Sequence, residues 1–213
     1  MKKTLSGLYA ITDESLMPVS EFTSMAEAAL SSGVKIIQYR DKSHNSEKKI
    51  KQAYELRVLC DKYNAILIIN DDIGLAIKSN ADGVHIGKDD GAINETRKHL
   101  GPDKIIGVSC YNKIKLAEQA IKEGADYIAF GSFFGSTIKP DAPKAEVQLI
   151  SIIKNRYDIP VCCIGGITTK NCHNLLSEKA DMLAVISELF SSQSTLDIKN
   201  KCAQFLSEFD IKH

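Results

Sequence analysis

The sequence of 213 residues has no net charge, no long apolar run and no linker that would separate two domains, and each absence excludes a class of protein. Lysine and arginine number 27, as do aspartate and glutamate, so there is no basic excess of the kind that nucleic-acid binding usually brings. No apolar stretch approaches the roughly 20 residues that cross a bilayer. The charged opening resembles the start of a signal peptide, but polar residues interrupt the stretch after it. We therefore expect a soluble, cytoplasmic protein with no nucleic-acid or membrane partner.

The six cysteines are scattered and form neither a C-x-x-C motif nor a zinc-like spacing with histidine. Free cysteine is commonly a small buried hydrophobe, so we interpret all of them as reduced structural thiols. Cys110 is the one thiol that follows the end of a predicted strand near other polar residues.

No linker rich in proline, glycine or serine divides the chain, so residues 1–213 are expected to form one domain. Short apolar runs alternate with amphipathic stretches, which is typical of strands alternating with helices. The predicted strands are Gly7–Thr12, Val34–Tyr39, Ala65–Ile69, Gly83–Ile86, Lys104–Cys110, Tyr127–Phe134, Ile159–Ile164 and Leu183–Ile186. Eight such units in one domain indicate an α/β fold, a closed (β/α)₈ TIM barrel with a parallel sheet. An open doubly wound sheet is the alternative, but no G-x-G-x-x-G follows the first strand.

A weak internal repeat supports this count of strands. Ala81-Asp82, Ala125-Asp126 and Ala180-Asp181 each stand just before an even-numbered predicted strand, and the second strand has Ser32-Gly33 in the matching place. A strand–helix pair repeated around a barrel would produce this pattern. Chance recurrence of so short a motif is the alternative.

Acidic residues gather at the carboxyl ends of two consecutive predicted strands, where a barrel of this type carries its catalytic groups. The clusters are Asp71-Asp72 and Asp89-Asp90, and carboxylates in such a place suggest a bound divalent cation. We expect Asp71 and Asp90 to bind Mg²⁺. Asp72 and Asp89 are expected to be helix caps or supporting groups, since aspartate is favoured as a cap.

Cations lie near these carboxylates. Arg40 and Lys42 follow the second strand and share one side of an extended segment by the two-residue strand period. Arginine offers a planar fork and lysine a point charge, so the two could clamp one diphosphate. Lys139, after the sixth strand, could pair with phosphate or form a Schiff base with a carbonyl substrate, and a metal and diphosphate site favours the first role.

Two further features have more than one interpretation. Gly165-Gly166 ends the seventh strand and, with a helix entry at Ile167–Thr169, predicts a phosphate site on the backbone; an ordinary tight turn is the alternative. His85 lies in an apolar run and is either a satisfied core residue or a side chain that faces the pocket. The strand ends offer no nucleophile–base pair of the Ser–His or Cys–His kind in the sequence.

In their order and placement these motifs resemble the thiamine-phosphate synthase family over nearly the whole chain. The matching segments are Leu8–Asp13, Gln38-x-Arg40-x-Lys42, Asn70-Asp71, Ala81–His85 with Gly87 and Asp90, Ile106–Ser109, Gly124–Tyr127, Lys139–Pro143, Ile164–Ile167 and Ala184–Ser187. The resemblance implies a Mg²⁺-dependent transferase. It would couple hydroxymethylpyrimidine diphosphate to a plain or carboxylated thiazole phosphate, giving thiamine phosphate and diphosphate.

The resemblance also implies residue roles. The pyrimidine substrate and its diphosphate would be held by Gln38, Arg40, Lys42, Asn70, Ser109 and Lys139, with Tyr9 and His85 lining the pyrimidine pocket. The thiazole phosphate would be bound by Gly166, Ile186 and Ser187, beside the loop of Ser136, Thr137 and Ile138. The expected catalytic residues are Arg40, Lys42, Ser109 and Lys139. The aminopyrimidine would shed diphosphate to leave a delocalised cation that the thiazole nitrogen captures, so no nucleophilic side chain is needed.

The sequence departs from the family pattern at a few positions. Ile138 stands where a second threonine is usual, Lys88 where glutamine is common, and Lys179 and Met182 replace glycines. Rival interpretations are a related thiazole tautomerase, which has histidine where Ser109 stands, a lysine-dependent aldolase, and a catalytically silent phosphate-ligand sensor. The sequence leaves open the preferred thiazole form and the oligomeric state, a homo-oligomer included.

Overall fold

The computed structural model describes residues 4–87, 91–135, 144–192 and 194–211, in which strands and helices alternate. The strands are β1 (Gly7–Ile11), β2 (Ile36–Tyr39), β3 (Ile66–Asn70), β4 (Gly83–Ile86), β5 (Ile105–Tyr111), β6 (Tyr127–Gly131), β7 (Val161–Ile164) and β8 (Met182–Val185). The helices are α1 (Phe22–Ser31), α2 (Ser46–Lys62), α3 (Ile73–Lys78), α4 (Ile93–Leu100), α5 (Ile114–Lys122), α6 (Gln148–Lys154), α7 (His173–Ser177), α8 (Ser187–Phe190) and α9 (Thr195–Asp210).

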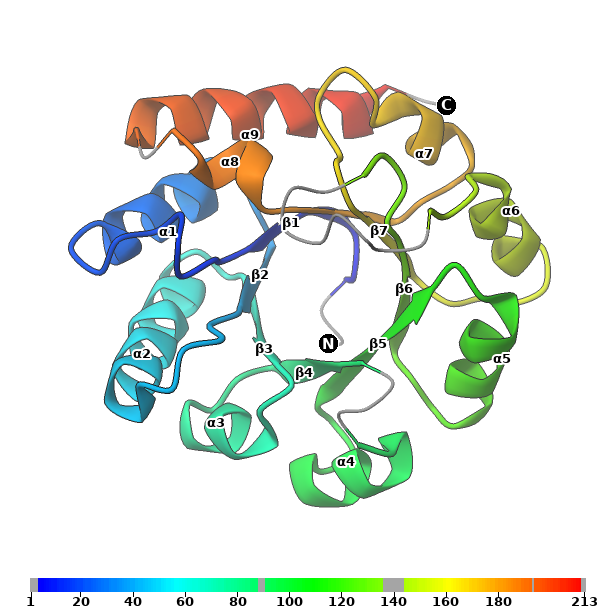
Figure 1. Ribbon diagram of the computed structural model, residues 1–213, viewed down its shortest axis with the longest axis horizontal. Coiled ribbons are helices and arrows are strands. Elements are labelled where there is room, and N and C mark those ends of the chain that lie inside the picture. The colour runs from blue at the N-terminus through cyan, green and yellow to red at the C-terminus, as the bar shows by residue number, and fades with distance from the viewer. Residues whose placement is uncertain (1–3, 88–90, 136–143, 193, 212–213) are drawn as a thin grey trace.

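The strands form a closed parallel barrel. Each strand pairs with the next, and β1 also pairs with β8. Figure 1 looks along this barrel and shows the helices as an outer ring around the strands, with α9 lying across α1 and α8. The α/β barrel predicted from the sequence is therefore confirmed. Among the described residues, no helix combines the length and apolar character that spanning a membrane requires.

The sixth strand is shorter than predicted. It was expected to continue to Phe134, but β6 ends at Gly131. The backbone N–H groups of Phe133 and Phe134 instead donate to the carbonyls of Ile164 and Gly165, at 3.2 and 3.0 Å, so the chain turns across the end of β7.

The helix expected at Ile167–Thr169 begins later. The carbonyl of Thr168 accepts from the N–H of Cys172 at 3.1 Å, and the side chain of Asn171 accepts from the N–H of Thr168 at 2.9 Å. These bonds close a turn, and α7 starts only at His173.

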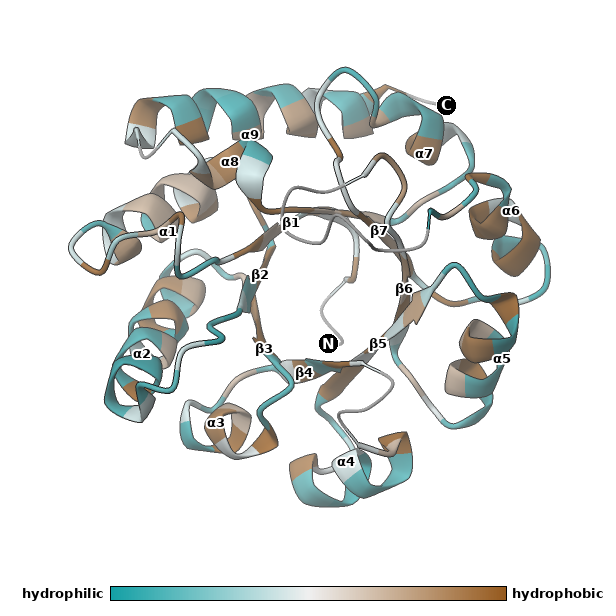
Figure 2. Ribbon diagram, in the orientation of Figure 1, coloured by the Kyte–Doolittle hydropathy of each residue, from teal (hydrophilic) through white to brown (hydrophobic). Residues whose placement is uncertain are grey.

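Strand side chains alternate between two apolar layers, as a period of two requires. Those that point outward, such as Ile37 and Ile69, pack under the helices in the larger cluster. Those that point inward, such as Ile36 and Ile68, fill the barrel, and Leu5 before β1 packs against them. Figure 2 shows predominantly apolar strands and helices that mix apolar with polar residues.

The Ala-Asp repeat has a structural role at the amino-terminal ends of the strands. The N–H of Asp126 donates to the carbonyl of Ile106 on β5 at 2.8 Å, and Oδ2 of Asp126 accepts from the N–H of Ile106 at 2.9 Å. The same reciprocal pair joins the other two aspartates to the preceding odd-numbered strands: Asp82 to Leu67 and Asp181 to Val161. Each carboxylate thereby continues the sheet by one hydrogen bond.

Each of these carboxylates also pairs with a cation on the helix that leads into the strand it binds. The pairs are Arg57–Asp82 at 2.9 Å, Arg97–Asp126 at 2.6 Å and Lys154–Asp181 at 2.8 Å. The repeat is thus a unit of two strands, in which one aspartate forms a hydrogen bond to the neighbouring strand and an ion pair with a helix. The shared role shows that it is not a chance recurrence.

Candidate functional site

A chain of hydrogen bonds crosses the inside of the barrel. Nε2 of Gln38 donates to the hydroxyl of Tyr9 at 2.8 Å, and that hydroxyl lies 2.9 Å from the hydroxyl of Tyr127. The Tyr127 hydroxyl lies 2.9 Å from Nδ1 of His85, and Nε2 of His85 lies 2.8 Å from Oγ of Ser109. Side chains from β1, β2, β4, β5 and β6 therefore share one polar network.

The Gln38 amide donates to the Tyr9 hydroxyl, but the other hydrogen bonds of the network can run in either direction, because a hydroxyl both donates and accepts and the roles of the His85 nitrogens depend on its tautomer. With the proton of a neutral His85 on Nε2, His85 donates to Ser109, and the Ser109 hydroxyl can donate to a bound molecule. With the proton on Nδ1, Nε2 accepts from Ser109 instead.

Ser109 and His85 lie at the distance of a nucleophile and its base, although the sequence suggested no such pair. The two residues belong to neighbouring strands, and only the barrel register brings them together. Nε2 of His85 can take a proton from Ser109 only in the tautomer that carries the ring proton on Nδ1. Both ring nitrogens of His85 have hydrogen-bond partners, as the core interpretation requires, and its role in a pyrimidine pocket stays a prediction.

Tyr127 belongs to this network, although the sequence did not single it out. Its ring stacks on the imidazole of His85 with centroids 5.6 Å apart, and it meets the ring of Tyr9 edge-on at 6.2 Å. Burial raises the pKa of Tyr127 well above its usual range, so the hydroxyl stays protonated. Gly107 makes room for it, since a Cβ at that position would lie 1.9 Å from the tyrosine ring. A glycine paired with a tyrosine on the next strand was the available signal.

Ser109 stands at an irregularity of β5. It pairs with Ala129, whereas Tyr111 pairs with Phe130, so Cys110 is an extra residue in the ladder. Burial raises the pKa of the Cys110 thiol to about 12, so it holds no reactive thiolate. All six cysteines are buried and none forms a disulfide, which agrees with the structural role expected of them.

Arg40 and Lys42 lead in opposite directions from the end of β2. Nη1 of Arg40 lies 3.3 Å from Oδ2 of Asp13 after β1, and Nζ of Lys42 lies 2.6 Å from Oδ2 of Asp71 after β3. The strand period predicted a shared side for the two cations. That period does not apply, because β2 ends at Tyr39.

The two aspartates after β3 have different roles. Asp71 has a left-handed backbone, with φ of 61°, and its Oδ2 accepts from Nζ of Lys42 and Nδ2 of Asn70, both at 2.6 Å. Asp72 caps α3 by accepting from the N–H of Leu75 at 2.8 Å, as predicted. Asp71 is therefore the carboxylate of this pair that side chains and ligands can share.

The donors at Asp71 fit a Mg²⁺ site that substrate completes. Mg²⁺ is usually bound by one or two carboxylates together with water and substrate phosphates. Both hydrogen bonds to the Asp71 carboxylate end on Oδ2, so Oδ1 takes no part in them. Asp90, the second predicted ligand, lies outside the described residues, as do Lys88 and Asp89. Within the described part of the chain, no three His, Cys, Asp or Glu side chains form a metal-binding group.

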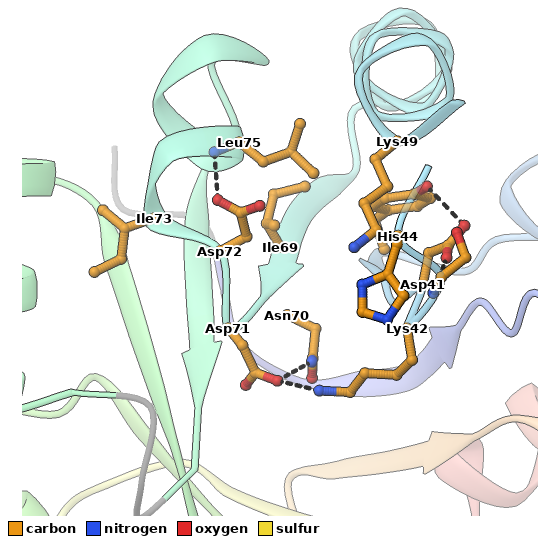
Figure 3. Close-up of a pocket in the computed structure, with 12 residues that line it drawn as sticks. Asp41, Lys42, His44, Lys49, Ile69, Asn70, Asp71, Asp72, Ile73 and Leu75 are labelled. Atoms are coloured by element: carbon orange, nitrogen blue, oxygen red, sulfur yellow. Dashed lines mark hydrogen bonds and ion pairs between the residues drawn. The ribbon is translucent and has the colours of Figure 1, made fainter. Parts of the chain in front are cut away.

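A cavity of about 410 Å³ opens beside Asp71, between the segments that follow β2 and β3. In Figure 3, Lys42, Asn70 and Asp71 meet at one side of it, while Lys49 reaches in from α2. The remaining walls come from β2, β3 and α3 and the loop before α2: Tyr39, Asp41, Ser43, His44, Ile69, Asp72, Ile73 and Leu75. The lysines make this cavity suitable for an anion next to the carboxylate.

The loop that carries Arg40 and Lys42 is built around a buried carboxylate. Oδ2 of Asp41 lies 2.5 Å from Nζ of Lys48, and Oδ1 accepts from the N–H of Ser43 at 2.7 Å. Burial acts to raise the pKa of Asp41, but the hydrogen bonds from Lys48 and Ser43 outweigh it and lower the pKa. An ionised Asp41 therefore fixes the loop from within.

Gly165 and Gly166 allow the segment after β6 to approach the end of β7. A Cβ at Gly166 would lie 1.9 Å from the carbonyl oxygen of Gly135, and a Cβ at Gly165 would lie 2.1 Å from Oγ of Ser132. Packing alone thus accounts for glycine at both positions. The phosphate-binding role of Gly166 stays a prediction.

The other predicted contacts of the thiazole phosphate are only partly described. Ile186 and Ser187 lie where β8 passes into α8. The predicted loop of Ser136, Thr137 and Ile138 lies outside the described residues. So does Lys139, which was predicted to bind the pyrimidine diphosphate.

Comparison with known proteins identifies the family. The profile of a family described as thiamine monophosphate synthase matches residues 8–189. The chain belongs to this family. A curated thiamine-phosphate synthase of Saccharophagus degradans is 45% identical over 196 residues, which cover 92% of this chain and 90% of that relative. The thiamine monophosphate synthase family is one of transferases, so the resemblance and the enzyme class expected from the sequence are confirmed.

Solved structures agree with this assignment. A thiamine phosphate pyrophosphorylase from Pyrococcus furiosus superposes with a TM-score of 0.86 at 30% identity, covering 96% of this chain and 95% of that one. A thiamine phosphate pyrophosphorylase from Bacteroides thetaiotaomicron gives a TM-score of 0.73 at 14% identity, covering 97% and 99%, and shares the fold.

Proposed function

We propose that this protein is a thiamine-phosphate synthase. It would couple hydroxymethylpyrimidine diphosphate to a thiazole phosphate and release diphosphate. The observation that carries the proposal is the contact of Lys42 with Asp71 at 2.6 Å. The N–H of Asp71 donates to the carbonyl of His85 at 2.9 Å, so this cation and carboxylate lie beside the polar network of the barrel. The similarity to a thiamine-phosphate synthase at 45% identity supports the same reaction.

Arg40 and Lys42 would bind the diphosphate. The side chain of Lys42 is 55% exposed, so it can turn from Asp71 to a phosphate bound in the neighbouring cavity. Arg40 is only 16% exposed and would offer a fixed planar fork. Asp71 would hold Mg²⁺, which when bound neutralises the charge of the departing diphosphate.

The polar network would hold the pyrimidine. Gln38 and His85 lie on opposite sides of the paired hydroxyls of Tyr9 and Tyr127, and the hydroxyl of Ser109 can donate to a bound molecule when it accepts from His85. Burial raises the pKa of both tyrosines, so these hydroxyls stay neutral next to a ring that becomes a cation. Tyr9 and Tyr127 are almost completely buried, which keeps water from that side of a reactive intermediate.

The direct test is the coupling reaction with purified protein. Hydroxymethylpyrimidine diphosphate is incubated with either thiazole phosphate form, with Mg²⁺ or with a chelator, and both thiamine phosphate and diphosphate are quantified. We expect equal amounts of the two products with Mg²⁺, loss of both on chelation, and a higher rate with one thiazole form. Absence of both products with Mg²⁺ would refute the proposal.

Two controls separate this reaction from the rival activities. Interconversion of the thiazole forms without pyrimidine would indicate a tautomerase, and a borohydride-trapped adduct would indicate a lysine-dependent aldolase.

Arg40→Ala should weaken diphosphate binding. Arg156→Ala is its matched control, since Arg156 pairs with Glu118 at 2.9 Å in an exposed contact and should leave the reaction unchanged.

Two parts of the proposal concern the protein as a whole. We expect a cytoplasmic location, which fractionation of cells producing the untagged protein would measure. Light scattering on the purified protein would decide between a monomer and the homo-oligomer that the sequence left open.

A further inference from the structure

The turn after β1 carries three consecutive polar residues that the proposed function does not use. They are Thr12, Asp13 and Glu14, and each of them contacts the segment from Arg40 to Lys42. The two segments meet because β1 and β2 are neighbouring strands whose carboxyl ends lie side by side. The turn therefore forms one wall against which the cationic segment lies.

Thr12 fixes the backbone of Arg40. Its hydroxyl accepts from the N–H of Arg40 at 2.9 Å and donates to the carbonyl of Arg40 at 3.2 Å. The side chain thus replaces the ladder hydrogen bonds at the point where both strands have ended. Thr12 is buried, so this clamp is protected from water.

Asp13 holds the guanidinium. Its Oδ2 lies 3.3 Å from Nη1 of Arg40, and its Oδ1 accepts from the N–H and the hydroxyl of Ser15 at 3.0 and 2.5 Å. The N–H of Met17 also donates to the carbonyl of Asp13 at 3.0 Å, which closes the turn. The side chain of Asp13 is only 7% exposed, so the carboxylate is fixed before it meets Arg40.

Glu14 contributes less to the position of the guanidinium. Its Oε2 lies 4.0 Å from Nη1 of Arg40, and its Oε1 accepts from the N–H of Lys42 at 3.2 Å. Both carboxylates approach the same nitrogen of Arg40, so neither of them uses the edge formed by Nε and Nη2. A pair of N–H groups on one edge is the geometry with which arginine binds a phosphate.

We infer that Asp13 is the positioning residue for Arg40 and that it keeps the Nε–Nη2 edge available for the diphosphate. The inference rests on the proposed role of Arg40 in the site. It gives a function to Thr12 and Asp13, which end the first segment that resembles the family and to which the sequence alone assigned no role.

A positioning role for Asp13 and simple charge repulsion predict opposite changes in diphosphate affinity when Asp13 is neutralised. A carboxylate that acted only as a counter-ion would repel diphosphate, so its neutralisation would tighten binding. A carboxylate that positions Arg40 does the reverse, because a misplaced guanidinium loses its paired hydrogen bonds to phosphate. The sign of the change therefore separates the two roles.

The experiment measures binding of inorganic diphosphate with Mg²⁺ by titration calorimetry. Asp13→Asn keeps one oxygen for Ser15 but turns an amide donor toward Arg40, and we expect about tenfold weaker binding. Asp13→Glu keeps the charge and displaces the carboxylate, so it should also weaken binding, by about threefold. Glu14→Gln is the matched control for charge and should change binding by less than about twofold.

A double-mutant cycle with Arg40→Ala completes the test. Arg40→Ala should weaken diphosphate binding by itself, and Asp13→Asn should cause no further loss in that background. Unchanged or tighter binding in both Asp13 variants, or an equal loss in the Arg40→Ala background, would overturn the inference. If Arg40→Ala leaves binding unchanged, the proposed site fails instead, and thiamine phosphate formation by the wild type tests the proposed function separately.

Discussion

At the amino-terminal end of the barrel Asp126 pairs with Arg97 at 2.6 Å, and at the carboxyl end Asp71 pairs with Lys42 at the same distance. The first carboxylate also accepts from a backbone N–H of β5, whereas the second, among the residues that the structure describes, accepts from side chains only. A carboxylate bound to the sheet cannot leave without breaking the sheet. A carboxylate bound to an exposed lysine can exchange that partner for a ligand.

The comparison shows that residue types alone do not distinguish a structural ion pair from a functional one. Three aspartates at the amino-terminal end have both a cation and a strand N–H as partners, and they repeat with the strands. At the carboxyl end, the described aspartates Asp13, Asp41 and Asp71 accept from turn N–H groups or from side chains. Variants at the amino-terminal end should therefore change stability, and variants at the carboxyl end should change the reaction.

The largest effect on stability is expected from Asp126→Ala. It removes the acceptor of the Ile106 N–H and the partner of Arg97, so the free energy of unfolding should fall by about 2–3 kcal/mol in urea titrations. The folded variant should form thiamine phosphate at the wild-type rate. Asp61→Ala is the control, since Asp61 pairs with Arg57 at 2.8 Å but is 70% exposed, and its loss should cost less than about 0.5 kcal/mol.

A smaller effect is expected from Tyr127→Phe inside the barrel. The change removes the hydroxyl that joins Tyr9 to His85, so the free energy of unfolding should fall by about 1–2 kcal/mol. The KM for the pyrimidine diphosphate should rise, because the network no longer orients Ser109. Tyr157→Phe, in the outer layer, should change neither quantity. A wild-type KM in Tyr127→Phe would show that the network is structural only.

The smallest effect is expected from Lys42→Met on metal binding without substrate. Nζ of Lys42 lies 2.6 Å from Oδ2 of Asp71 and competes with a metal ion for this carboxylate. Removal of the lysine charge should therefore tighten Mn²⁺ binding, measured by electron paramagnetic resonance, by about three- to tenfold. Lys49→Met is the control, since Lys49 lines the same cavity (Figure 3). Weaker or unchanged Mn²⁺ binding in Lys42→Met would argue against Asp71 as a ligand.

The sequence predicted the barrel because apolar runs and amphipathic stretches are local patterns. It also separated Asp72 as a cap from Asp71, since each role depends on position relative to a strand end and a helix start. Where the prediction failed, as at the end of β6 and the start of α7, hydrogen bonds between distant segments or within a turn decided the boundary.

The parts of the site that the sequence did not reveal depend on tertiary register. Tyr127 reads as an ordinary core residue, and only the closed barrel brings its hydroxyl to Tyr9, 118 positions away. Asp13 reads as a turn residue, and its contact with Arg40 spans 27 positions. Local patterns carry no information on such distances, although family resemblance supplied several residues of the same network.

The central claim is that Asp71 serves the reaction and not the fold, and Asp71→Asn tests it most directly. Asparagine tolerates the left-handed backbone at this position, so the free energy of unfolding should stay within about 0.5 kcal/mol of the wild type. The rate of thiamine phosphate formation with saturating substrates and Mg²⁺ should fall by about 100-fold. A wild-type rate in this stable variant would contradict the account.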